Sequence, residues 1–254
     1  MHILGWTSFL ALGAISMAST VTSNTIVQRE TALNEFLAIL LEYLPDIDGD
    51  ITDVTDTIAD FEELLADLLD ITTTYNELGQ TCTDYTIIFA RGTSEPGNVG
   101  VLVGPPLFIA LEDLIGSSAL TIQGVNDYAA SVEGYLEGGS AVASAEMASQ
   151  IESAVSDCPD TKLIVSGYSQ GCQVVHNAIN SLSATTAAYI SSVLLFGDPD
   201  DGQALSNVAS SKVDTFCHVD DDICDDGVLI LPAHLTYAEN VAAAAAFAVA
   251  AAKR

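Results

Sequence analysis

Apolar positions recur at helical spacing in the N-terminal part of the chain. Between Thr31 and Leu44 they fall three or four residues apart, and Pro45 ends this segment. After a turn rich in Asp and Gly, a second segment from Val54 to Leu68 repeats the spacing and carries acidic residues on its other face. The pattern predicts two amphipathic helices joined as a helical hairpin.

Short apolar runs alternate with helical patterns from Cys82 onward. The runs predict strands at 85–89, 119–124, 162–166, 190–196 and 213–217, and the other patterns predict helices at 107–115, 144–155, 170–182 and 241–252. Such alternation is typical of the α/β class, here a three-layer sandwich with a mostly parallel central sheet. We expect an N-terminal extension at 19–71, which holds the hairpin, and one larger domain at 72–254.

The first 24 residues contain no acid and no Lys or Arg, and an apolar run from Ile3 to Ala18 ends in small residues. This pattern predicts a secretory signal peptide at 1–18 and therefore a secreted, extracellular protein. A short membrane anchor is the alternative, and the run is short for a bilayer span. The apolar tract at 241–252 is shorter still, and we expect it to form an alanine-rich helix that packs on the core.

The charge of the chain is strongly one-sided, with 35 acidic and 6 basic residues and a net charge of −29. Electrostatic repulsion disfavours nucleic acid and anionic lipid surfaces as partners, so we expect no nucleic-acid binding and no stable membrane insertion. We expect a monomer. The acidic turn at 46–50 invites a calcium interpretation, but Ile51 and Thr57 occupy positions where an EF-hand loop needs Gly and Glu, so a solvated turn is favoured.

One short motif carries candidate chemistry. The run Gly167-Tyr168-Ser169-Gln170-Gly171 directly follows a predicted strand and directly precedes a predicted helix. A serine on so sharp a turn needs small residues two positions before and after it, and its hydroxyl then stands above the edge of the sheet. The pattern is common by chance, but its strand and helix context predicts a nucleophile elbow with Ser169 as the nucleophile.

A serine nucleophile needs a base, and the base needs an acid that holds its tautomer. His234 lies in a late loop that can reach back to the sheet edge, which favours it over His176 and His218. Acid candidates are the three adjacent residues Asp220, Asp221 and Asp222, and periodicity does not choose among them.

Five cysteines in a secreted chain are candidates for disulfides. Cys217 and Cys224 are close enough to close one loop, and Cys82 and Cys158 could join two distant segments, although four cysteines allow three connectivities. Cys172 follows the elbow, where a buried and inert thiol is expected.

Four ordered motifs together resemble the fungal cutinase family. They are the segment FARGTSEPGNVG at 89–100, the GYSQG elbow, the loop between Cys217 and Cys224 with an Asp inside it, and PAHL at 232–235. The resemblance implies a cutinase-like α/β-hydrolase fold and a serine carboxylic ester hydrolase. Its substrates would be cutin, other polyesters or lipid esters, and it would need no metal and no organic cofactor.

The resemblance also implies a role for each site residue. Ser169 is the nucleophile, Asp221 the acid and His234 the base, while Thr93 and Gln170 form the oxyanion hole through backbone N–H groups and the Thr93 hydroxyl. Cutinases commonly have serine where Thr93 stands. The implied disulfides pair Cys82 with Cys158 and Cys217 with Cys224. An acetylxylan esterase and a non-catalytic, surface-binding secreted protein are the alternative functions.

The helical hairpin departs from a minimal cutinase. Its apolar stripe must be buried somewhere, and an open crevice beside Val99, Val101, Leu102 and the apolar run at 228–231 offers a surface to cover. We hypothesise that residues from about Thr31 to Asp70 form a lid that moves aside at a lipid, micelle or polymer surface. The alternatives are a hairpin docked on the far side of the sheet and a propeptide that is removed.

Overall fold

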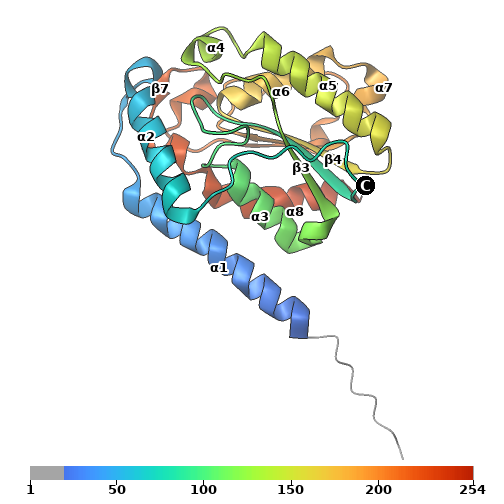
Figure 1. Cartoon of the computed structure of the whole chain (residues 1–254). Helices are drawn as coiled ribbons and strands as arrows, with labels where there is room; N and C mark the ends of the chain where they lie inside the picture. Colours follow the sequence, from blue (N-terminus) through green and yellow to red (C-terminus); the bar gives the residue numbers. More distant parts are fainter. Residues whose placement is uncertain (1–19, 254) are drawn as a thin grey trace, which may run out of the picture.

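Five apolar runs form one parallel sheet in the computed structural model (Figure 1). Its strand order is β3 (Leu120–Gly124), β2 (Tyr85–Ala90), β4 (Lys162–Tyr168), β5 (Ile190–Phe196) and β6 (Val213–Phe216). The structure describes residues 20–253, with side chains from residue 32 onward, so the expected signal peptide at 1–18 lies outside the described residues. Because β4 is hydrogen-bonded to β2 on one side and to β5 on the other, the turn that follows it leaves from the middle of the sheet.

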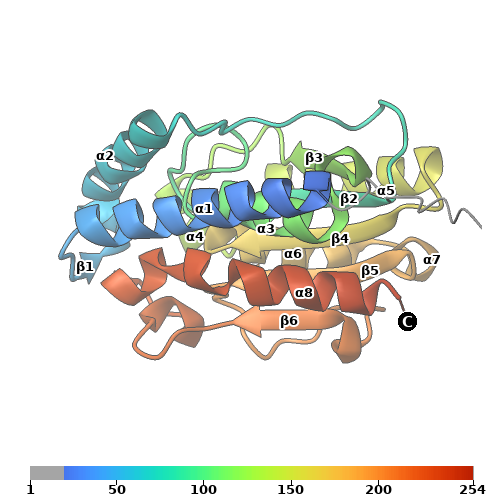
Figure 2. The same cartoon turned by 90° about the horizontal axis from the view of Figure 1, so that it is seen from below.

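Helices cover both faces of the sheet, which confirms the predicted three-layer α/β sandwich (Figures 1 and 2). One face carries α5 (Ala141–Asp157) and α6 (Gln170–Ser181), and the other carries α3 (Gly104–Ile115) and α8 (Val241–Ala251). Two buried apolar clusters correspond to the two faces. Ala244, Ala245 and Ala248 of α8 are fully buried, so the alanine-rich tract packs on the core as expected. None of the described helices combines the length and apolar character needed to cross a bilayer.

Short elements connect these layers. The further described ones are α4 (Val132–Leu136), α7 (Ala184–Ala187) and the 3-10 turns η1 (Ser117–Ala119), η2 (Ser210–Lys212), η3 (Asp222–Asp225), η4 (Pro232–Leu235) and η5 (Tyr237–Asn240). The turns η3, η4 and η5 follow β6 and hold the chain close to the end of β4.

Two helices precede the sheet, α1 (Thr20–Tyr43) and α2 (Ile51–Leu69). They lie in different places. α1 packs alongside α3, on the outer side of that layer, where Phe36 and Leu40 are buried (Figure 2). α2 lies across the end of the molecule where β2 and β4 terminate (Figure 1). It begins three residues earlier than the apolar spacing predicts, because the side chain of Asp50 accepts a hydrogen bond from the backbone N–H of Thr52 and caps the helix.

Both ends of α2 are joined to the larger domain. At its start, β1 (Gly49–Asp50) pairs antiparallel with β7 (Leu229–Ile230), and the N–H of Ile51 donates to the carbonyl of Val228 at 2.8 Å. Beyond its end, the carbonyl of Thr73 accepts hydrogen bonds from the N–H groups of Asn98 and Val99. The last two residues of the acidic turn between the helices thus form a small sheet with β7, while Asp46 and Asp48 are exposed to solvent, as expected.

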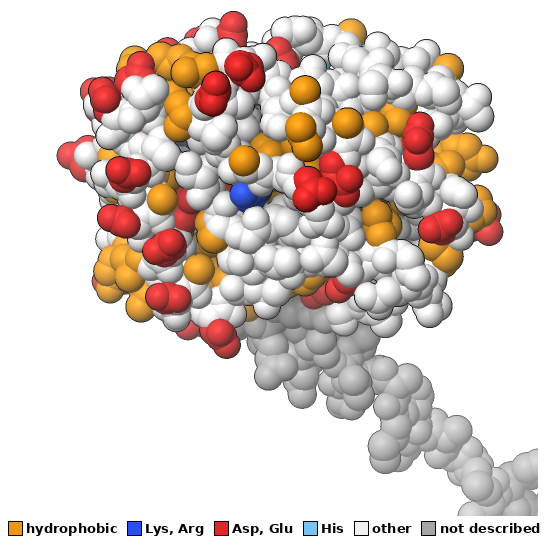
Figure 3. Space-filling model, turned by 45° about the horizontal axis from the view of Figure 1, so that its top comes forward, with side chains coloured by type: hydrophobic (Ala, Val, Ile, Leu, Met, Phe, Trp, Pro, Cys, Tyr) orange, Lys and Arg blue, Asp and Glu red, His pale blue; other side chains and the backbone are white. Residues whose placement is uncertain are grey.

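Acidic side chains are spread over the surface, with few basic ones among them on the face that Figure 3 shows. This distribution follows from the excess of acids in the sequence.

Candidate active site

Ser169 occupies the sharp turn between β4 and α6. Its backbone has φ 55° and ψ −126°, a strained conformation for a residue with a side chain. A Cβ atom on Gly167 would lie 2.5 Å from the carbonyl oxygen of Gly171, and one on Gly171 would lie 2.1 Å from that of Ala90. Both positions therefore need glycine, which is the requirement inferred from the sequence.

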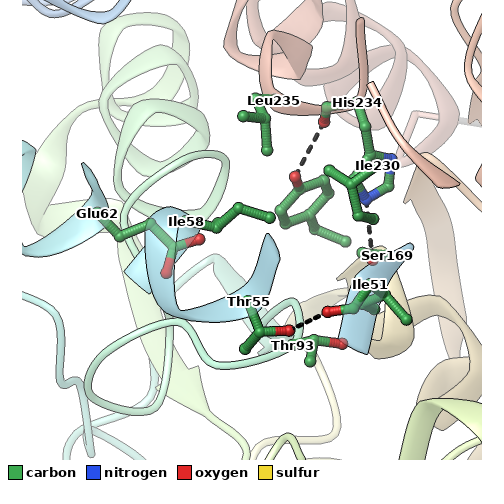
Figure 4. Close-up of a pocket in the computed structure, with 10 residues that line it drawn as sticks. Ile51, Thr55, Ile58, Glu62, Thr93, Ser169, Ile230, His234 and Leu235 are labelled. Atoms are coloured by element: carbon green, nitrogen blue, oxygen red, sulfur yellow. Dashed lines mark hydrogen bonds between the residues drawn. The ribbon is translucent and has the colours of Figure 1, made fainter. Parts of the chain in front are cut away.

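Three side chains from separate segments meet at this turn. Oγ of Ser169 lies 2.9 Å from Nε2 of His234, and Nδ1 of the same ring lies 2.8 Å from Oδ2 of Asp221 (Figure 4 shows the first contact). His234 belongs to η4, and Asp221 caps η3. All three residues are buried, so the hydrogen bonds are sheltered from water. This geometry can move a proton from a serine hydroxyl to an imidazole that a carboxylate holds in place.

Additional donors surround the carboxylate of Asp221. Tyr237 donates its phenolic hydrogen to Oδ2 at 2.6 Å, and the N–H of Ile223 donates to Oδ1. Burial raises the pKa of Asp221, but hydrogen bonds from His234, Tyr237 and Ile223, together with the attraction of His234, outweigh burial and hold the pKa below its usual range. The carboxylate is thus ionised at neutral pH.

Its two acidic neighbours point elsewhere. Asp220 is exposed, and Oδ2 of Asp222 accepts the N–H of Leu229 in β7. The structure therefore separates three adjacent aspartates that the sequence pattern leaves equivalent.

Gln170 and Thr93 are also brought to the turn. Gln170 is the first residue of α6, and its side chain is buried. Its Nε2 donates to Oγ1 of Thr93 at 3.1 Å and to the carbonyl of Ser131, while its Oε1 accepts from the hydroxyl of Tyr128. Because Oγ1 of Thr93 accepts this hydrogen bond, its own hydrogen remains available for another acceptor. Thr93 and Ser169 line the same pocket.

The other two described histidines lie apart from Ser169 and bind different partners. His218 stacks on Tyr237 with ring centroids 4.1 Å apart, and its ring nitrogens contact the carbonyl of Ala233 and Oδ1 of Asn240. Its backbone N–H donates to the Tyr237 hydroxyl, so His218 supports the tyrosine that binds Asp221. No pattern in the sequence indicates this supporting layer.

Two disulfides are formed, between Cys82 and Cys158 and between Cys217 and Cys224. These are the pairs that the resemblance implies. The second closes the loop that carries Asp221 and so restricts its movement. Cys172 is free and fully buried, and burial raises the pKa of its thiol well above the ordinary value. The protonated, buried thiol is inert, as expected.

The pocket over Ser169 is lined from two sides (Figure 4). α2 provides Ile51, Thr55, Ile58 and Glu62, and the larger domain provides Thr93, Tyr168, Ser169, Ile230, His234 and Leu235. The apolar lining differs from the expected one. Val99, Val101 and Leu102 are fully buried in the core, where α3 and the sheet cover them, and do not line the pocket.

A sequence model of the Cutinase family matches residues 81–252, about two thirds of the chain. The chain belongs to the cutinase family. Cutinase cut1 of Trichoderma harzianum is 46% identical over 242 residues, which cover 95% of each chain. The structure of Trichoderma reesei cutinase in complex with a phosphonate inhibitor superposes with a TM-score of 0.73 and 45% identity, over 88% of this chain and 99% of that one.

Membership of the cutinase family makes the chain a carboxylic ester hydrolase. An acetylxylan esterase structure aligns with 68% of the chain and 100% of its own length, at a TM-score of 0.55 and 20% identity. At that identity the likeness concerns the fold alone.

One group of side chains has the spacing of metal ligands. His176, Asp198 and Asp200 each offer one ligand atom within 4.8 Å of the others. These atoms already serve the protein, because Nε2 of His176 binds Oδ2 of Asp198 at 3.0 Å and a carboxylate oxygen of Asp200 accepts from Gln203. In this cutinase the group therefore acts as a polar link between α6 and the loop after β5.

Proposed function

We propose that the chain is a secreted serine esterase that hydrolyses cutin-type polyesters and short- to medium-chain acyl esters. The contact series from Ser169 through His234 to Asp221 carries this proposal. The names of its relatives support cutin as the substrate. The aliphatic pocket lining of Ile51, Ile58, Ile230 and Leu235 suits an acyl chain better than a sugar, and so favours this function over acetylxylan hydrolysis.

The reaction proceeds in two steps. Oγ of Ser169 attacks the ester carbonyl while His234 takes its proton, and the same proton then goes to the departing alcohol. The acyl group remains on Ser169. Water, deprotonated by His234, attacks this acyl-enzyme and releases the acid, and the proton returns to Ser169. Asp221 holds the imidazole and stabilises its charged form, and Thr93 with the N–H of Gln170 stabilises the oxyanion in both steps.

We predict that Thr93→Val lowers kcat for p-nitrophenyl butyrate by about a hundredfold, because the valine keeps the shape of threonine but cannot donate to the oxyanion. KM should change little, since the donor acts in the transition state. Thr93→Ser is the matched control and should stay within about threefold of the wild type. Equal loss of kcat in both variants would assign the effect to packing rather than to the hydroxyl.

The described site is closed in this structure. Ser169 is only 3% exposed, and the pocket has a water-accessible volume of about 20 Å³, room for only one or two water molecules. An ester carbonyl cannot reach Oγ until a wall of the pocket moves. Because α2 forms one wall of the pocket and covers it with apolar side chains such as Ile58, we infer that α2 is the part of the extension that acts as a lid.

The proposed function is tested by ester hydrolysis with the full chain. We expect the chain to hydrolyse p-nitrophenyl butyrate and to release hydroxy fatty acids from cutin. The rate of p-nitrophenyl butyrate hydrolysis should increase several-fold above the critical micelle concentration of an uncharged detergent. An absence of hydrolysis in all conditions would contradict the esterase, whereas hydrolysis that micelles do not change would contradict only the lid. Gel filtration tests whether the chain is a monomer. Expression in a host cell tests whether the signal peptide directs secretion.

A further inference from the structure

α2 carries one acid on the face that it turns toward the active site. Glu62 is only 1% exposed, and its neighbours on that face are Ile58, Phe61 and Leu65. Its carboxyl group points to the interior of the pocket that holds Ser169 (Figure 4). Among the described residues, Oε2 of Glu62 has no hydrogen-bond partner. A buried and unpaired polar atom is costly, so this acid calls for an explanation.

The charged groups that face Glu62 come from the loop after β2. Glu95 is buried and accepts three backbone hydrogen bonds, from Gly92, Val101 and Leu102, at 2.8 to 2.9 Å. Arg91 donates to the carbonyls of Glu95 and Tyr128. One buried cation thus faces two buried carboxyl groups. Burial raises the pKa of Glu95 as well, but its three N–H donors and Arg91 oppose this rise, so Glu95 is the better place for the negative charge and Glu62 is the surplus acid.

The surroundings of Glu62 favour its protonated form while α2 covers the pocket. Burial raises its pKa well above the ordinary value, repulsion from Glu95 adds to this, and Arg91 opposes it only in part. Tyr168 also faces this region, and burial raises the pKa of its hydroxyl well above the usual range, so the phenol stays neutral. His234 and Asp221 lie on the far side of the pocket and bind each other.

We propose that Glu62 makes opening of α2 dependent on pH, because it is neutral under the closed helix and ionises when the helix lifts and water reaches it. The inference rests on the proposed lid and deepens it, since it names the group that sets how easily the lid opens. No catalytic role is assigned to Glu62.

The direction of the effect follows from proton binding. In water a glutamate titrates near pH 4.3. Above that pH the open form has lost a proton that the closed form retains, so the equilibrium shifts toward the open form by up to about tenfold for each pH unit. The shift continues until the pH reaches the raised pKa of the closed form. The site is therefore closed in acid and opens more readily as pH rises.

The test measures the ratio of p-nitrophenyl butyrate hydrolysis with and without uncharged micelles, from pH 5 to pH 8, with the full chain. Any effect of pH on the chemical step is common to both measurements and cancels in the ratio. The wild-type ratio should fall several-fold between pH 5 and pH 7, toward one, as opening becomes spontaneous. Glu62→Gln, which stays neutral, should keep a high ratio that changes less than about twofold. Glu63→Gln, a neighbouring exposed acid, should follow the wild type.

Two outcomes would overturn the inference. They are a wild-type ratio that pH does not change, and a Glu62→Gln ratio that falls in parallel with the wild type. Either result leaves the esterase and the lid standing, whereas no micelle activation at any pH removes the lid itself. Amide exchange of α2 in the wild type gives a second measurement that needs no variant. After correction for intrinsic exchange rates, the free energy of opening α2 should fall with pH while that of α6 stays constant.

Discussion

Ser169→Ala is expected to lower kcat/KM for p-nitrophenyl butyrate by on the order of 10⁴-fold or more. The substitution removes the atom that forms the acyl-enzyme in the proposed mechanism, and it leaves the backbone of the turn and the proposed oxyanion donors in place. Alanine also lacks the proton that His234 accepts at 2.9 Å. Initial rates with the purified full chain, above and below the micelle concentration, measure the loss.

Ser166→Ala is a matched control for this variant. Ser166 lies in β4, three residues before Ser169, and its buried Oγ has no hydrogen-bond partner among the described residues. Its removal should leave activity and stability nearly unchanged. A fluorophosphonate should label the wild type and Ser166→Ala but not Ser169→Ala. Labelling of Ser169→Ala, or a loss of activity below about tenfold, would place the nucleophile elsewhere.

Asp221→Asn is expected to lower kcat by about 10⁴-fold. The amide cannot accept from Nδ1 in the way that a carboxylate does, so the imidazole takes the wrong tautomer, and no negative charge stabilises its protonated form. The asparagine has a single side-chain oxygen. The hydroxyl of Tyr237 and the backbone N–H of Ile223, which now donate to different carboxylate oxygens, would both compete for it. Initial rates and thermal unfolding, measured together, separate the loss of chemistry from any loss of stability.

Asp220→Asn serves as the control for Asp221→Asn. Asp220 is exposed, and its φ of 70° is one that asparagine also tolerates, so the same charge change one position away should leave kcat within about twofold. If both variants lost activity equally, the net charge of the loop, and not the contact with His234, would be the cause.

The order and type of the main elements could be predicted from the sequence, because each buried strand is a short apolar run and each covering helix has an apolar stripe. What could not be predicted depends on contacts between distant segments. The pairing of Gly49–Asp50 with Leu229–Ile230 joins two-residue strands that leave no periodic signal. The different positions of α1 and α2 follow from the surfaces that each one finds, which the similar spacing of both helices does not reveal.

The site divides in the same way. The elbow is a local pattern, so its turn and its glycines could be derived from neighbouring residues alone. The choice of Asp221 among three adjacent aspartates came from the family resemblance, and spacing had no means to make it. The support that Tyr237 and the Gln170 side chain provide, like the burial of Glu62, arises when segments far apart in sequence meet. Tyr237 and Glu62 belong to no motif, and the motif that contains Gln170 does not reveal the contacts of its side chain.

The attachment of α2 at both ends limits how it can move. The small sheet holds its start, and the hydrogen bonds to Thr73 hold the chain just beyond its end. A motion that uncovers Ser169 would then be a hinge rotation of α2 about the line through these two attachment points. One attachment point, Ile230, lies four residues before His234, so the rotation would pull on the backbone that carries the imidazole. Uncovering the serine would thus also act on the segment that carries its catalytic partner.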